Sequence, residues 1–196
     1  MADRDVDFGW VDENGLWWCV PSGTAAIRPE WFHTLVSVMS AADRAGALRR
    51  DGFTAAIEDL DGTAHRIVAQ HPSGLRLLGH SSLLTAALCY WEEYDLKFAS
   101  SPARHARQQA AFEHAYDAVR AVGLAALGEP ALQGRDRDEF QHQWSAWRVG
   151  DVLLAVYQAV GDVQFGLSIQ ADVRRYPADA ALQPRSPFVD WMWSAP

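Results

Sequence analysis

The sequence predicts an α+β fold: an antiparallel sheet built from hairpins, with helices packed mainly on one face. Three observations lead to this prediction. Residues 163–173 alternate apolar and polar side chains with a period of two, as a half-buried strand does. Residues 102–127 carry apolar side chains at helical spacing. Strand-like and helix-like segments follow each other without a regular βαβ alternation, which is typical of α+β proteins.

The central prediction is a three-stranded antiparallel meander over residues 140–175. Residues 152–160 are apolar on both faces, as expected for the middle strand. Gly150 and Gly161 separate the three segments, and glycine readily adopts the positive φ that tight hairpin turns need. A polar loop at residues 133–139 is expected to lead into this meander.

Two helices are predicted outside the meander. The first covers residues 29–50, since Pro29 suits the first helical position, where its missing N–H has no intrahelical acceptor. The second begins at Pro102 and ends near Gly128, with an apolar stripe formed by Phe112, Tyr116, Val119 and Gly123.

The segment between these helices predicts more strands. Residues 53–59 and 63–70 form an expected hairpin, and residues 75–79 a third short strand. Ser81 or Ser82 is then expected to cap a helix that contains Leu84, Leu88 and Trp91. The two sheet regions can join in one antiparallel sheet, so the chain is predicted to be a single α+β domain over residues 1–196.

Composition limits the classes of partner. With a net charge of −8, the chain repels phosphate, so no nucleic-acid partner is expected and a basic protein partner fits better. The N-terminus does not resemble a signal peptide, and no apolar run is long enough to span a bilayer, so no membrane contact is expected. Cys19 and Cys89 are isolated thiols, which predicts a reducing, cytoplasmic location.

One segment suggests catalysis. Residues 75–88 read as strand, Gly-His-Ser, helix, as in the nucleophile elbow of α/β-hydrolases. That motif requires a second glycine where this chain has Leu83. The alternative function that follows is a small-ligand-binding protein or a hydrolase-like enzyme with a site near Ser81 and Glu92, assisted by His80 and Glu93. The structural alternative is that the serine only caps a helix.

No cofactor or metal is predicted. The seven histidines are scattered, and none pairs with another histidine or a cysteine at the close spacing that zinc sites use. The sequence also lacks a Gly-x-Gly-x-x-Gly, P-loop, His-Glu-x-x-His or Cys-x-x-Cys motif.

The nine tryptophans point to a binding surface instead. Trp144 and Trp147 lie an odd number of positions apart, so they should face opposite sides of one strand. An aromatic residue on the open face of a sheet can anchor a partner. The predicted partner-binding residues are Trp144 and Trp147 with an acidic cluster at the rim, Glu92, Glu93 and Asp95. Two structural explanations stay open: an N-terminal hairpin or the tail around Trp191 and Trp193 covers the face, and the acidic cluster is a solvated helix end.

The chain resembles small actinobacterial proteins that are mostly uncharacterised or assigned as immunity proteins of polymorphic toxins. The likeness covers roughly residues 80–175. It rests on the pattern Leu127-Gly128-Glu129-Pro130, a polar loop, a Trp-bearing strand and the hairpin from Arg148 to Leu154. The resemblance implies a cytoplasmic, non-enzymatic binder that blocks a toxin, and it carries over no catalytic residue.

The sequence therefore predicts a non-enzymatic protein-binding module, and the resemblance implies an immunity-type inhibitor of a basic toxin domain. Besides the enzyme or small-ligand alternative, a homo-oligomer that uses the tryptophan-rich tail stays open.

Overall fold

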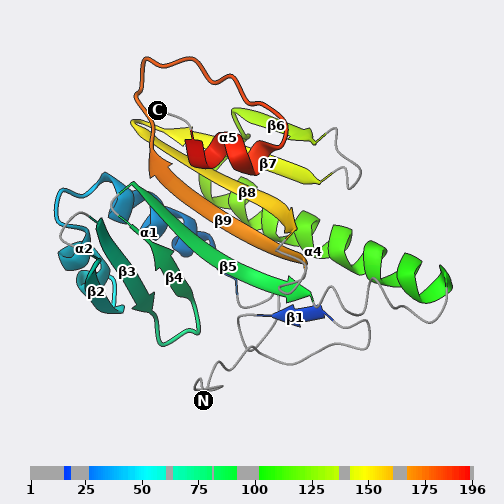
Figure 1. Ribbon diagram of the computed structural model, residues 1–196, viewed down its shortest axis with the longest axis horizontal. Coiled ribbons are helices and arrows are strands. Elements are labelled where there is room, and N and C mark those ends of the chain that lie inside the picture. The colour runs from blue at the N-terminus through cyan, green and yellow to red at the C-terminus, as the bar shows by residue number, and fades with distance from the viewer. Residues whose placement is uncertain are drawn as a thin grey trace.

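The computed structural model describes residues 16–18, 27–60, 64–80, 82–91, 102–136, 142–160 and 167–194. Within them, nine strands form one sheet, in which eight follow the order β2-β3-β4-β5-β9-β8-β7-β6 and β1 (Leu16–Trp18) pairs with β5. Every strand pair is antiparallel. This sheet and its helices confirm the predicted α+β fold (Figure 1).

The predicted meander is confirmed. It consists of β7 (Gln143–Val149), β8 (Val152–Val160) and β9 (Leu167–Arg175), with β8 in the middle. The side chains of residues 152–159 are all buried, because side chains pack against β8 on both faces. Gly150, with a φ of 60°, lies in the turn between β7 and β8.

The other half of the sheet contains one error of prediction. β2 (Thr54–Leu60), β3 (Ala64–Gln70) and β4 (Arg76–Gly79) confirm the expected hairpin and short strand. The helix expected after Ser82 is wrong, because these residues form the strand β5 (Leu83–Trp91). β5 lies between β4 and β9 and joins the two halves of the sheet.

The helix spacing of Leu84 and Leu88 explains this error. Positions four apart fit a helix, but they also fit a strand, in which Leu84, Ala86 and Leu88 share one face. Pairing with β4 on one side and β9 on the other satisfies the backbone of β5, and a sequence window does not show those partners.

Three helices cover the first face of the sheet: α1 (Pro29–Ser40), α2 (Arg44–Arg50) and α4 (Pro102–Leu127). The prediction of one helix over residues 29–50 is wrong, because the chain breaks between α1 and α2. Oδ1 of Asp43 accepts a hydrogen bond from the Gly46 backbone N–H at 2.9 Å and so caps α2 as a separate helix.

The long helix α4 confirms its prediction. Its expected apolar stripe is buried against α1 and the sheet (Phe112, Tyr116, Val119 and Gly123). The helix ends at Gly128, whose φ of 77° is the left-handed conformation common after helix C-termini.

The second face, which points away from these three helices, is covered over β7–β9 by α5 (Phe188–Ser194) and the segment before it. Figure 1 shows α5 in front of β7 and β8, with α4 behind them. The polar loop expected at residues 133–139 is wrong in its first part, because β6 (Leu132–Arg135) pairs with β7 at the sheet edge. Among the described helices, none is both long and apolar enough to cross a bilayer.

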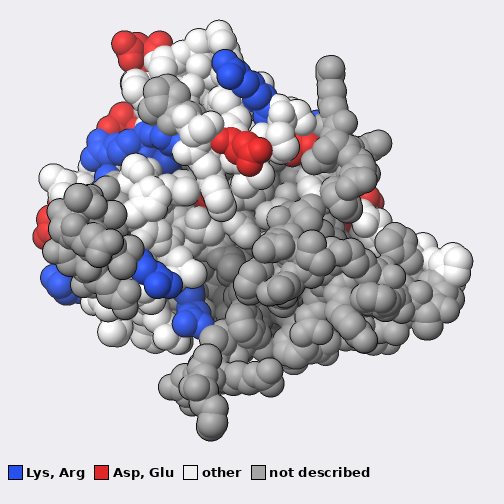
Figure 2. All heavy atoms as spheres, viewed as in Figure 1, with Lys and Arg blue, Asp and Glu red and all other residues white. Residues whose placement is uncertain are grey.

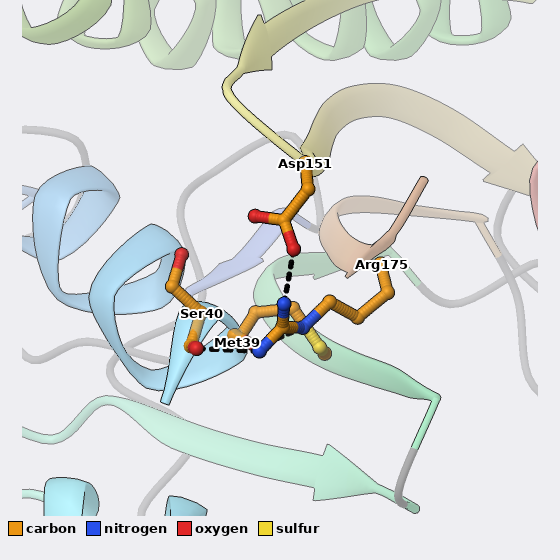
Figure 3. A network of polar contacts seen from close by, with 4 residues as sticks. All are labelled: Met39, Ser40, Asp151 and Arg175. Atoms are coloured by element: carbon orange, nitrogen blue, oxygen red, sulfur yellow. Dashed lines mark hydrogen bonds and ion pairs between the residues drawn. The ribbon is translucent and has the colours of Figure 1, made fainter. Parts of the chain in front are cut away.

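An arginine links α1 to the meander. Nε of Arg175 donates to the Met39 carbonyl at 2.9 Å, and the same guanidinium donates to the Ser40 carbonyl and pairs with Asp151 (Figure 3). The last carbonyls of a helix lack intrahelical donors and form the negative end of its dipole. Arg175 therefore stabilises the C-terminus of α1 and fixes it to the sheet.

Candidate functional site

The two predicted anchor tryptophans lie on opposite faces of β7, as their spacing indicated; Trp147 is buried and Trp144 is half-buried. Trp147 packs on the first face and is only 2% exposed. Its indole N–H donates to the Gly128 carbonyl at 2.7 Å, and its ring meets Phe32 edge to face and lies over Gly123. These contacts make Trp147 a core residue.

Trp144 lies on the second face beneath the C-terminal helix. Its ring stacks on Phe188 of α5, with ring centres 4.3 Å apart and planes within 9° of parallel. On its other side it lies against Gly134 of β6, where a Cβ atom would come within 2.6 Å of the ring. The C-terminal tail, one of the alternatives that the sequence left open, thus covers part of Trp144 through Phe188, and Trp144 stays half-buried.

Most of the remaining predicted site residues lie in parts of the chain that the structure does not describe. Glu92, Glu93, Asp95 and Ser81 lie outside the described residues. His80 is exposed, and its Nδ1 lies 3.0 Å from the Ser82 hydroxyl oxygen.

The expected nucleophile elbow is not formed. That motif needs a strand, a sharp turn and then a helix. Here the turn between β4 and β5 leads from strand to strand, with the His80 backbone N–H donating to the Leu83 carbonyl at 2.9 Å. Residues 75–88 therefore resemble the hydrolase motif in sequence but not in structure.

A buried acid lies at the centre of the second face. Asp172 of β9 is 0% exposed, and its Oδ2 accepts hydrogen bonds from the Tyr157 hydroxyl at 2.7 Å and the Trp193 indole at 2.8 Å. Its Oδ1 is buried and has no hydrogen-bond partner within standard geometry among the described residues. Burial raises the pKa of Asp172 above its ordinary value, and the hydrogen bonds from Tyr157, Thr85 and Trp193 oppose that rise.

This acid helps to hold α5 in place. Trp193 is the residue of α5 that bonds Asp172, and Arg174 of β9 donates to the Met192 carbonyl at 2.6 Å. At the other end of α5, the Asp136 carboxylate accepts from the Phe188 backbone N–H at 2.8 Å. Buried polar contacts thus fix both ends of α5 on the sheet.

The second face continues beyond α5 over β2–β5, where none of the described helices packs on it, and we call this part the open half. Cross-strand partners form a continuous row across it and end at Asp172: Ala56, Val68, Leu78 and Thr85. Leu78 is 46% exposed, and Trp193, which borders this row through its bond to Asp172, is 58% exposed. Figure 2 shows basic side chains over β3 and β4 on this face, and Arg66 and Arg76 belong to these strands.

A polar pocket of about 300 Å³ lies at the opposite edge of the sheet, between α4 and the strands β6 and β7. A second hollow on the α5 side of β6 is lined in part by the same Arg135 and Trp144. Among the described residues, no group of three or more His, Cys, Asp or Glu side chains is placed to hold a metal ion.

Comparison with protein-family models, with curated proteins and with solved structures finds no match to this chain.

Sequence reasoning placed Asp172 on the polar side of its strand but did not foresee its burial. The tail contained a sign of this burial, because its apolar residues need a surface to pack against: Phe188, Trp191 and Met192. The polar pocket carried no comparable signal, since its residues come from three elements and form no motif.

Proposed function

We propose that this protein is a non-enzymatic protein-binding module and that the open half of the second face docks its partner. The observation that carries the proposal is the exposure of Leu78 on β4 and of Trp193 on α5, which bonds Asp172 at the end of the same cross-strand row. Large apolar side chains grouped on an exposed surface are typical of protein-binding sites. The open half also continues the surface on which α5 already packs, so it is shaped to receive a further apolar element.

The row from Ala56 to Thr85 favours a folded partner. Its side chains belong to paired strands and are fixed by the sheet, so little conformational entropy is lost when they are covered. Leu78 lies at the centre of the row, with Val68 and Thr85 as its cross-strand neighbours. A central apolar residue with a more polar surround is the usual arrangement of a binding hot spot.

Two features of the charge distribution describe the partner. The net charge of the chain favours a basic partner, and the basic side chains on the open half favour carboxylates at the contact. The net charge of −8 attracts a basic domain at long range and accelerates encounter. At the surface itself, Arg76 of β4 suits carboxylates, because a guanidinium forms charge-assisted hydrogen bonds with them. A toxin domain held by an immunity-type inhibitor fits this description, and we propose that relationship as the biological role.

The test is direct binding and protection. The protein is co-expressed with a toxin encoded beside its gene, and the two purified proteins are titrated against each other. Leu78→Asp, which puts a charge at the centre of the open half, should weaken binding by about 2 kcal/mol or more and abolish protection. Val149→Asp is the matched control, because Val149 is an exposed apolar residue at the β7–β8 turn, outside the open half.

Protection by the wild type and by V149D, but not by L78D, supports the proposal. If L78D folds and protects cells as well as the wild type, the open half is not the docking surface. If the wild-type protein neither binds nor protects, the immunity-type role is wrong.

A further inference from the structure

The polar pocket between α4 and the sheet edge is an open hollow on the first face, separate from the open half. It holds about 300 Å³, close to the lower limit of small-molecule sites. Polar side chains from three elements line it: Tyr116, Asp117 and Arg120 of α4, Gln133 and Arg135 of β6, and Gln143 and Ser145 of β7.

A hydrogen-bonded group forms the inner wall. The Ser145 hydroxyl is buried, and its Oγ lies 2.9 Å from the Tyr116 hydroxyl oxygen. Nε of Arg120 donates to the same Oγ at 3.2 Å, and Nη2 of Arg120 donates to the Gln133 side-chain oxygen at 2.8 Å. Arg120 is therefore held in one orientation, with the rest of its guanidinium N–H groups available.

The pocket contains more hydrogen-bond donors than acceptors. Only one of the two hydroxyl protons of Tyr116 and Ser145 can lie between their oxygens, so the other proton is left to donate elsewhere. Burial raises the pKa of Tyr116 to about 12, so its hydroxyl keeps its proton at neutral pH. No hydrogen bond or ion pair joins the Arg135 side chain to another described residue, and this side chain lines the pocket.

The charge of the lining is positive. Arg120 and Arg135 contribute two cations, and Asp117 at the exposed rim contributes one carboxylate. Arg120 donates to the Gln133 side-chain oxygen, and within the described part of the chain neither Arg120 nor Arg135 forms an ion pair with a carboxylate. Guanidinium groups placed in this way match the geometry of carboxylate and phosphate oxygens.

We propose that this pocket binds a small oxyanion, a carboxylate or phosphate group, between Arg120, Arg135 and the Tyr116–Ser145 hydroxyl pair. The anion accepts from the two guanidinium groups and from the remaining hydroxyl proton. Gln133 and Gln143 at the walls contact the uncharged part of the ligand. This site is independent of the docking surface on the second face.

The experiment uses inorganic phosphate and acetate as separate probes on the full chain, at constant ionic strength. A ligand that binds only the folded state raises the melting temperature along a saturation curve. The wild type should show a saturable rise with at least one probe, and the probe that binds identifies whether phosphate or carboxylate is preferred. Isothermal titration calorimetry then gives the dissociation constant of that probe.

Two variants locate the binding site. Arg135→Gln should raise the dissociation constant about tenfold or more, because it removes one charged donor from an exposed side chain with little effect on folding. Arg49→Gln is the matched control, since it removes the same charge from the exposed end of α2. Its dissociation constant should equal that of the wild type.

The proposal is overturned if neither probe gives a saturable shift up to about 50 mM. It is also overturned if R135Q and R49Q respond alike, because the effect would then come from general ion binding. Neither result bears on toxin protection, so this inference and the proposed function fail independently.

Discussion

Asp172 places a carboxyl in a part of the sheet from which water is excluded, and this makes folding dependent on pH. Because burial raises its pKa in the folded protein above the ordinary value of 3.8, the native state binds a proton more tightly than the unfolded chain. The contribution of this group to stability is therefore full below pH 3.8 and is lost as the pH rises through the native pKa.

Asp172→Asn should remove this pH dependence. The amide keeps an oxygen that accepts from Tyr157 and Trp193 but cannot ionise. Urea unfolding from about pH 4 to pH 8 should show the wild type losing stability relative to D172N as the pH rises. Asp190→Asn, on the exposed side of α5, should follow the wild type. A constant difference between wild type and D172N across this range would show that Asp172 is not the titrating group.

Arg175 gives a second prediction for a single residue. Arg175→Gln removes the donors to two α1 carbonyls together with the ion pair to Asp151, and should lower stability by about 1–2 kcal/mol. Relief of the repulsion between Arg175 and Arg44 offsets part of the loss. Asp151→Asn removes only a half-exposed ion pair and should cost about 0–1 kcal/mol.

Urea midpoints at low and high salt test this ranking. The cost of D151N should shrink at high salt, whereas most of the cost of R175Q should persist. Equal costs for the two variants would mean that the bonds to Met39 and Ser40 contribute nothing.

At the scale of an element, α4 contains Gly123, where replacement by alanine should lower stability although alanine is usually preferred in helices. In most helices Gly→Ala stabilises by about 1 kcal/mol. At Gly123 a Cβ atom would lie 2.9 Å from the Trp147 ring and 3.1 Å from Phe32. The hydrogen bond of Trp147 to Gly128 prevents the ring from moving away freely. Gly123→Ala should therefore lower stability by about 1–3 kcal/mol through overpacking.

The control is Ala121→Gly on the exposed side of the same helix. It should cost about 1 kcal/mol and so report the intrinsic preference of α4. Denaturant unfolding of both variants measures the two effects. A higher urea midpoint for G123A than for the wild type would show that the core adapts to the added methyl group.

The elements differ in how far the sequence alone predicts them. α4 and the meander carry long, regular patterns between glycine and proline boundaries, and both were predicted. β5 was not, because its leucines fit both periods and only pairing with β4 and β9 decides between them. β6 has just four residues, one of them Gly134, so its pattern is too short to indicate a strand.

For the whole molecule, one sheet with a buried centre predicts a gradient of local stability. β8 has a paired strand on each side and buried side chains along residues 152–159, whereas β2 and β6 end the ordered path of strands. In hydrogen exchange followed by mass spectrometry, amides of β8 should exchange last and those of β6 early. If β6 and β8 exchange at the same rate, β6 opens only when the whole sheet unfolds.

The sequence predicted the arrangement of sheet and helices better than it predicted which surfaces are open. The sequence placed Trp144 and Trp147 on opposite faces, which follows from local geometry alone. Which face is open depends on where residues 188–194 pack, and that is a contact between distant segments. The polar pocket likewise combines residues of α4, β6 and β7, so no local pattern could indicate it.

The contact between Gly134 and Trp144 also prevents β6 from sliding along β7. Directly opposite residues of an antiparallel pair point to the same side, and Gly134 is opposite Trp144. Any displacement of β6 would bring Gln133, Arg135 or Leu132 to this position, and each carries a Cβ atom where the ring leaves no space. An edge strand of four residues has few hydrogen bonds to fix its alignment. The absence of a side chain at Gly134 and the flat ring of Trp144 therefore fix the register of β6 against β7.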